Sequence, residues 1–312
     1  MDENELLAKI LPSLPQTDAV KVGPGDDCAV VSSPSSSSDT VLKTDAVVRG
    51  IHFTEETPAE SVGRKALARC LSDFAAMGAT PEHALITIGL PENTTDEWIT
   101  LLYDGINTLA KEHGVSITGG ETTSTSVDLF VSVAMTGVVE KDSFVSRSGA
   151  QPGDAIFVSG DLGGSIEGRH LTFDPRLKEG KWLAENFDIH AMIDLRDGLA
   201  TDLPRVLECS KVGAEIHATS IPVHRDAKIR NRDGKSSKPP RAAALTDGED
   251  YELLIVLPAS KAVELLDSWR QTFPETNLSC IGKILDTPGL LIRDENGIKA
   301  LNAHGYVHFK ES

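Results

Sequence analysis

A long helix with an acidic residue on its apolar side constrains this fold more than any other feature of the sequence. The stretch TPAESVGRKALARCLSDFAAMGATP opens with a capping box, in which Thr57 caps, Pro58 fits the first turn and Glu60 reaches back. Gly78 and Pro81 mark the other end. The pattern predicts one continuous helix between these signals.

Asp73 belongs to the side of this helix that should face the interior. At 100° per residue it shares a stripe with Val62, Ala66, Cys70 and Met77. A buried carboxylate stays ionised only with a cation or several hydrogen-bond donors beside it. Taken alone, Asp73 fits a metal site and a buried ion pair with arginine equally well.

Further acidic residues accompany glycines where the expected strands end or begin. VGPGDDCAVV places Asp26 and Asp27 between a Gly-Pro-Gly turn and an apolar run, and by itself it is more typical of a surface loop. The other positions are Thr44-Asp45, Gly119-Gly120-Glu121, and Asp194 with Asp197. Together they favour a shared cation, because oxygen ligands without a His/Cys cluster suit Mg²⁺ completed by water and substrate phosphates.

Strands and helices are mixed along the chain, which predicts α/β or α+β architecture. Besides the helix above, helices are expected at 4–14, 96–112, 180–186, 198–209 and 260–272, and strands at 28–32, 40–43, 84–90, 115–118, 128–138, 155–159, 214–218 and 251–257. The insert HRDAKIRNRDGKSSKPPR is expected to be a mobile loop and SSPSSSSD an exposed hairpin loop. A length of 312 residues suggests two domains, 1–145 and 146–312.

The charge balance argues against several classes of partner. Lys and Arg number 30 against 47 Asp and Glu, a net charge of −17, and such a surface repels nucleic acid and anionic lipid. MDENELLAKI lacks the apolar core of a signal peptide and no apolar run is long enough to span a bilayer, so we expect a cytoplasmic protein. Cys28, Cys70, Cys209 and Cys280 lie in apolar surroundings and should be buried, reduced thiols.

Neither GxxxxGK[ST] nor GxGxxG occurs in the sequence, so a phosphate enzyme of this kind needs a less common nucleotide-binding architecture. Eight stretches, which cover nearly the whole chain in order, resemble the thiamine-monophosphate kinase family of the aminoimidazole ribonucleotide synthetase-like superfamily. They are GPGDDCAVV, TDAVVRGIHF, RKALARCLSDFAAMGATP, GGETT, RSGAQPGD, DLRDGLATDL, DGEDYELL and GYVHF.

The resemblance implies a two-domain aminoimidazole ribonucleotide synthetase-like fold. The N-terminal α/β domain would bind ATP and metal and dimerise through its strands, and the C-terminal domain would be α+β. ATP and several Mg²⁺ ions would lie between the domains. The implied reaction is direct transfer of the γ-phosphoryl group of ATP to thiamine monophosphate, which needs positioning and charge neutralisation rather than a covalent nucleophile.

Matched position by position, the resemblance also implies roles for individual residues. The implied metal ligands are Asp27, Thr44, Asp45, Asp73, Glu121, Asp194 and Asp197, with Asp26 supporting Asp27. The implied nucleotide contacts are Gly120, Glu121, Arg147, Arg196 and Tyr103. His52, Glu249 and Tyr306 match positions that hold the thiamine phosphate.

The sequence departs from the family pattern at four of these places. Lys43 stands where a small hydroxyl residue is usual, and a charged lysine cannot ligate Mg²⁺. Glu121 replaces an aspartate, Arg196 a serine, and Asp247 a glycine. In one interpretation Lys43 and Arg196 stand in for a lost metal ion and neutralise phosphate directly; in the other the site has weakened or changed substrate.

Two other functions stay open at this level. One is a synthetase-type member of the same superfamily that uses ATP to activate an amide or carbonyl oxygen. The other is a catalytically weakened binding homologue. The persistence of the acidic residues at 27, 45, 73, 194 and 197 favours a working kinase.

Overall fold

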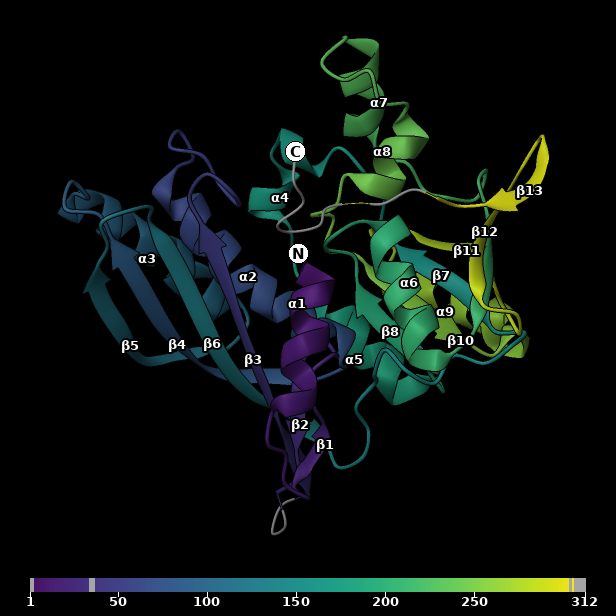
Figure 1. Ribbon diagram of the computed structural model, residues 1–312, viewed down its shortest axis with the longest axis horizontal. Coiled ribbons are helices and arrows are strands. Elements are labelled where there is room, and N and C mark those ends of the chain that lie inside the picture. The colour runs from purple at the N-terminus through teal and green to yellow at the C-terminus, as the bar shows by residue number, and fades with distance from the viewer. Residues whose placement is uncertain (1–2, 34–36, 303–304, 306–312) are drawn as a thin grey trace.

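The computed structural model describes residues 3–33, 37–302 and Gly305, and it contains two β-sheets with helices packed between and around them (Figure 1). The first sheet has the spatial order β1 (Val20–Val22), β2 (Ala29–Val31), β3 (Ser38–Val48), β6 (Phe130–Glu140), β4 (Thr80–Leu90), β5 (Ser116–Ser124). The second has the order β13 (Gly297–Ala300), β12 (Gly289–Asp294), β9 (Gly213–His217), β11 (Leu278–Leu285), β7 (Ala155–Ser159), β10 (Leu253–Leu257), β8 (Ala191–Asp194). The mixed architecture is thus confirmed, whereas a domain boundary at residue 145 stays a prediction.

Neighbouring strands are antiparallel except for the pairs β4–β5 and β9–β12. The helices are α1 (Glu3–Ile10), α2 (Ala59–Ala76), α3 (Asp96–Glu112), α4 (Arg169–Thr172), α5 (Leu177–Asn186), α6 (Leu199–Ser210), α7 (Arg225–Arg232), α8 (Pro240–Thr246) and α9 (Ala262–Thr272), with short 3₁₀ turns at Leu11–Ser13, Ser165–Glu167 and Ala259–Lys261. Within the described chain, no helix combines the length and apolar character needed to cross a membrane.

Helix α2 is the central element of the molecule. It packs against α3, β3 and β6 on the side of the first sheet, and against α4, α5 and β8 on the other side. Asp73 is buried there, as predicted. The predicted capping box is wrong, because the Thr57 hydroxyl accepts a hydrogen bond from the Thr54 amide and α2 begins after Pro58 without a side-chain cap.

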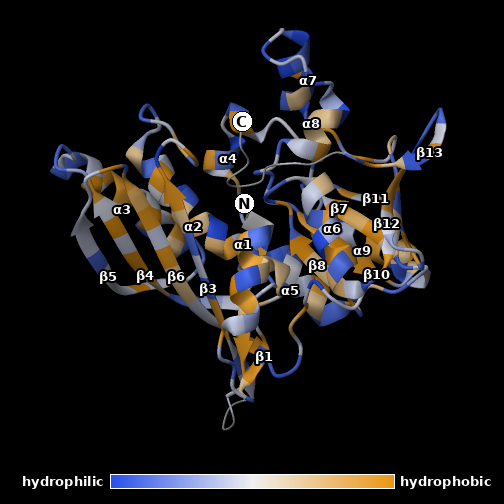
Figure 2. Ribbon diagram, viewed as in Figure 1, coloured by the Kyte–Doolittle hydropathy of each residue, from blue (hydrophilic) through white to orange (hydrophobic). Residues whose placement is uncertain are grey.

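Three other expectations need correction. The insert at 224–241 contains α7 and the start of α8 rather than a mobile loop, and Figure 2 shows that α7 is hydrophilic. Thr44-Asp45 and Gly119-Gly120-Glu121 lie inside β3 and β5, because both strands continue past the glycines and polar residues that seemed to end them. Cys209 and Cys280 are exposed, whereas Cys28 and Cys70 are buried.

The alternation of β3 decides which of its side chains can reach α2. Val41 and Val47 are fully or almost fully buried, and Lys43 and Asp45 share their side of the strand. Thr44 is exposed on the opposite face of the strand. A charged pair thus projects from β3 into the space between the sheet and α2.

Two glycines allow α2 and α3 to touch backbone to backbone. A Cβ atom at Gly63 would lie 1.9 Å from the carbonyl oxygen of Leu102, and one at Gly105 would lie 1.9 Å from that of Glu60. No real Cβ atom tolerates such a contact, so these positions fix the separation of the two helices.

We therefore expect Gly105→Ala to lower the free energy of unfolding by about 1–3 kcal/mol, which is the usual cost of overpacking a tight contact. Thr108→Ala, at an exposed position of the same helix, is the matched control and should change it by no more than about 0.5 kcal/mol. Urea unfolding followed by circular dichroism measures both. A Gly105→Ala protein as stable as the wild type would contradict the close approach.

Candidate active site

Three buried carboxylates from separate elements meet at the centre of the molecule. Asp27 precedes β2, Asp73 lies on α2, and Asp194 ends β8 of the second sheet. Each can offer one oxygen such that the three oxygens lie within 4.8 Å of one another. We call Asp27, Asp73 and Asp194 the acidic cluster.

Three side chains of the protein donate hydrogen bonds to the carboxylates of this cluster. The Lys43 ammonium donates to Asp73 Oδ1 at 2.7 Å and to the Asp27 carbonyl oxygen at 2.9 Å. The Arg147 guanidinium donates to Asp27 Oδ1 at 2.5 Å. The Ser72 hydroxyl donates to Asp194 Oδ2 at 2.6 Å. Each carboxylate thus has one partner, but the donors do not satisfy all of the oxygens.

The oxygens that remain point to a cation. Asp27 Oδ2 and Asp73 Oδ2 are buried and have no hydrogen-bond partner. Burial raises the pKa of the Asp73 carboxyl to about 8 against the opposing charge of Lys43, and burial followed by the charge of Asp27 raises the pKa of Asp194. Orphaned carboxylate oxygens on two members of such a cluster fit a hard divalent cation such as Mg²⁺, which compensates their charge.

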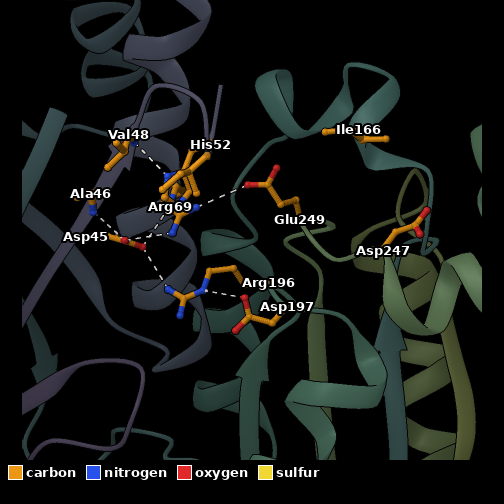
Figure 3. Close-up of a pocket in the computed structure, with 11 residues that line it drawn as sticks. Asp45, Ala46, Val48, His52, Arg69, Ile166, Arg196, Asp197, Asp247 and Glu249 are labelled. Carbon is orange, nitrogen blue, oxygen red and sulfur yellow. Dashed lines mark hydrogen bonds and ion pairs between the residues drawn. The ribbon is translucent and has the colours of Figure 1, made fainter. Parts of the chain in front are cut away.

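A second charged group lies beside the acidic cluster and centres on Asp45. Arg69 of α2 donates to both oxygens of Asp45, at 3.2 and 3.1 Å, and Arg196 donates to Oδ2 at 3.2 Å (Figure 3). Burial alone would raise the pKa of the Asp45 carboxyl, but these two guanidinium groups lower it overall. Arg196 also approaches Asp197, which pairs with Arg205 at 2.7 Å.

Asp45, Arg69, Arg196 and Asp197 line a cavity of about 490 Å³ between the two halves of the chain. Asp45, Arg69 and Arg196 lie together on one side, Asp197, Asp247 and Glu249 add carboxylates, and Val48 and Ile166 contribute apolar groups (Figure 3). Ile51 also lines the cavity. A cavity that combines charged and apolar side chains suits a ligand that carries phosphate next to an organic ring.

Glu249 enters this cavity from the loop before β10 and is held from α2. Lys65, which is fully buried, lies 2.7 Å from Glu249 Oε1, and the Tyr251 hydroxyl donates to the same oxygen at 3.2 Å. Tyr251 itself accepts a hydrogen bond from Arg69 at 3.2 Å and stacks on Phe173 with ring centroids 3.9 Å apart. Glu249 and Tyr251 adopt left-handed backbone angles, φ 54° and 53°, so this loop conformation is maintained at a cost.

His52 lies at the edge of the same cavity as a neutral ring. Its Nδ1 accepts a hydrogen bond from the Val48 amide at 3.0 Å, and its carbonyl oxygen accepts one from Lys65 at 2.6 Å. Burial, reinforced by the charges of Arg69 and Lys65, lowers the pKa of His52 to about 4.

The structure gathers most of the residues that the sequence singled out, but not all of them. Asp27, Asp73, Asp194, Asp45, Asp197, Arg147, Arg196, His52 and Glu249 belong to the cluster, its partners or the cavity. Gly120 and Glu121 lie on the exposed edge strand β5, and Thr44 faces away from the cluster. Tyr103 is on α3, where it packs against the larger hydrophobic core. Tyr306 lies outside the described residues.

Sequence reasoning missed Lys65, Arg69, Ser72 and Tyr251. A signal for three of them was present, because Lys65, Arg69, Ser72 and Asp73 follow one another at helical spacings of four, three and one residues. A polar line through a helix that is otherwise apolar indicates a buried polar face. Tyr251 had no comparable signal, since its role depends on the conformation of the loop before β10, in which it lies.

Comparison with known proteins places the chain in a family. Residues 25–139 match the family model described as AIR synthase related protein, N-terminal domain. The thiamine-monophosphate kinase of Rhodopirellula baltica is 36% identical, with 98% of this chain and 97% of that protein aligned. The enzyme of Bacillus subtilis is 31% identical, with 99% and 100% aligned. The chain belongs to the thiamine-monophosphate kinase family.

The solved structures agree with this assignment. The structure of AaThiL complexed with AMPPCP and TMP superposes with a TM-score of 0.83 at 28% identity, covering 99% of this chain and 97% of that one. The thiamine-monophosphate kinase of Stenotrophomonas maltophilia gives a TM-score of 0.74 at 31% identity, covering 93% and 94%. The family recognised from the eight sequence stretches is therefore confirmed over nearly the full length.

The environment of His52 predicts how stability depends on pH. Its pKa is about 4 in the folded protein against an ordinary value of 6.5, so between these values the unfolded chain binds more protons. Stability should therefore fall as the pH falls from 6.5 to 4. His52→Asn keeps an acceptor for the Val48 amide and should remove up to about one proton from the pH slope of the unfolding free energy. Urea titrations of both proteins across this range test it, and identical slopes would contradict the neutral, half-buried ring.

Proposed function

We propose that this protein phosphorylates thiamine monophosphate with ATP, and that the acidic cluster and the adjoining cavity are where it does so. The observation that supports this best is the placement of the cluster, with its orphaned carboxylate oxygens, next to a cavity lined by charged and apolar side chains. Its relatives over nearly the whole chain carry the name of this activity.

The step is a transfer between two phosphates. An oxygen of the thiamine phosphate attacks the γ-phosphorus of ATP, the bond from that phosphorus to the β–γ bridging oxygen breaks, and ADP leaves with the bonding electrons. The product is thiamine diphosphate. The site has to bring two negatively charged phosphate groups together, so charge neutralisation is its main task.

The side chains near the cluster suit that task. Asp27, Asp73 and Asp194 would hold Mg²⁺, with Asp45 and Asp197 as further candidate ligands. Bound there, Mg²⁺ would neutralise phosphate oxygens and orient them. Arg147 and Arg196 supply fixed positive charge near the cluster, and a guanidinium group suits phosphate oxygens as a hydrogen-bond donor.

The thiamine phosphate would be held at the opposite end of the cavity. Lys65 holds the carboxylate of Glu249 and the backbone carbonyl of His52, and the Val48 amide orients the neutral ring of His52. A carboxylate at this position suits a cationic heterocycle, and Val48, Ile51 and Ile166 provide an apolar contact for its ring. We include Tyr306 among the residues that hold the thiamine phosphate on the basis of the family resemblance alone.

A homodimer is part of the proposal. The outer face of the first sheet carries exposed Leu42 and Leu85 around a largely apolar depression, next to the exposed edge strand β5. A second copy of the chain on this face would cover it and would bring Thr44, Gly120 and Glu121 into an interface. In a single chain these three residues lie away from the acidic cluster. We also propose that the protein acts in the cytoplasm.

The kinase proposal is tested by incubating purified protein with ATP, Mg²⁺ and thiamine monophosphate and separating the products by chromatography. Thiamine diphosphate and ADP should appear in equal amounts. ADP and free phosphate without thiamine diphosphate would favour a synthetase-type reaction, and ATP binding without turnover would favour a weakened homologue.

Asp194→Asn should lower kcat/KM in this assay by at least about 100-fold, because the amide keeps the shape of the side chain but removes a charged ligand. Glu264→Gln makes the same change at an exposed position of α9 and should leave the rate unchanged. Thermal unfolding of both variants checks that they are folded. An Asp194→Asn enzyme with the wild-type rate would show that the cluster is not where phosphoryl transfer occurs.

A further inference from the structure

We propose that the ammonium group of Lys43 occupies one cation position of the acidic cluster, so that the cluster binds one divalent ion fewer than its carboxylates could hold. This rests on the proposed function only in taking the cluster as a metal site. The proposal concerns Lys43, which cannot itself be a metal ligand. In this proposal the lysine limits how many ions the site accepts.

The contacts of Lys43 resemble those that a bound cation would make. Its Nζ atom lies 2.7 Å from Asp73 Oδ1 and 2.9 Å from the Asp27 carbonyl oxygen, so it joins two members of the cluster through oxygen atoms. The side chain is mostly buried, with 14% of it exposed.

The alternation of side chains along β3 directs Lys43 toward the acidic cluster. Lys43 and Asp45 project from the same face of the strand toward α2, so the lysine stem leads directly to Asp73. The aliphatic part of the chain spans the gap, and only the ammonium group reaches the carboxylates.

Counting charges shows how many ions the remaining oxygens can accept. When all three carboxylates are ionised to bind a metal ion, the cluster carries three negative charges, and Lys43 and Arg147 balance two of them. The oxygens left without a partner, Asp27 Oδ2 and Asp73 Oδ2, are available to a bound ion, and a single divalent ion is enough to balance the remaining charge. A second divalent ion beside Lys43 would meet a fixed positive charge in a buried place, where like charges repel strongly.

The competing interpretation is that Lys43 is only a structural counter-ion for Asp73. In that case its removal would destabilise the protein but leave the number of bound ions unchanged. The two interpretations therefore differ in metal stoichiometry, which can be measured without any substrate.

The experiment is a titration with Mn²⁺, a paramagnetic substitute for Mg²⁺, in which the free ion is followed by electron paramagnetic resonance at pH 7.5. Neither nucleotide nor thiamine phosphate is present, so failure of the kinase assay does not affect the result. We expect Lys43→Ser and Lys43→Met each to bind one more Mn²⁺ per chain than the wild type. Lys43→Arg keeps the charge and should keep the wild-type number.

Lys21→Met is the matched control. Lys21 also pairs with a buried aspartate, Asp39 at 2.6 Å, so the variant loses the same kind of ion pair outside the acidic cluster. It should bind as many ions as the wild type. Circular dichroism melts establish that each protein is folded, and the Met variant retains the apolar stem if the Ser variant does not fold. Equal stoichiometry for the wild type and a folded Lys43→Ser or Lys43→Met protein would overturn the proposal, as would loss of a bound ion.

Discussion

The site depends on a line of buried polar side chains along α2. Lys65, Arg69, Ser72 and Asp73 lie close together on a helix that is otherwise packed in hydrophobic side chains. Lys65 binds Glu249 and Ser72 binds Asp194, both from the second half of the chain. Arg69 and Asp73 bind Asp45 and Lys43 from the first sheet. One helix therefore sets the positions of both walls of the cavity.

Such an arrangement is expensive to maintain. Taking charged groups out of water costs several kcal/mol for each ion after relaxation, and ion pairs inside a protein often recover no more than that cost. Hydrophobic residues of the same size would have stabilised the interior at least as well. The retention of so many buried charges, with some carboxylate oxygens unsatisfied, is best explained by the charge that the site must receive. A divalent cation would satisfy these carboxylate oxygens and would at the same time bind the phosphates of the substrates.

The sequence predicted the chemistry of the site better than its geometry. Asp73 was identified as buried from its position on a helical stripe, and the eight family-like stretches led to the correct family. Strand ends were misplaced around Asp45 and Glu121, because glycine and polar residues usually end a strand and here the sheet continues through them. The partners of Asp73 could not be derived, since Lys43, Asp27 and Asp194 are distant in sequence and meet only when both sheets pack on α2. The helices at 224–246 were missed because a polar segment stabilised by its contacts resembles a loop.

The central claim, that Asp27, Asp73 and Asp194 hold a divalent ion next to the nucleotide, is tested most directly by a crystal structure of the protein with Mn²⁺ and a non-hydrolysable ATP analogue. The anomalous scattering of Mn²⁺ locates each ion without reference to the protein coordinates. The account predicts a peak between these three carboxylates, within ligand distance of Asp27 and Asp73 and close to the phosphates of the analogue. Bound nucleotide with no anomalous peak at the acidic cluster would contradict it.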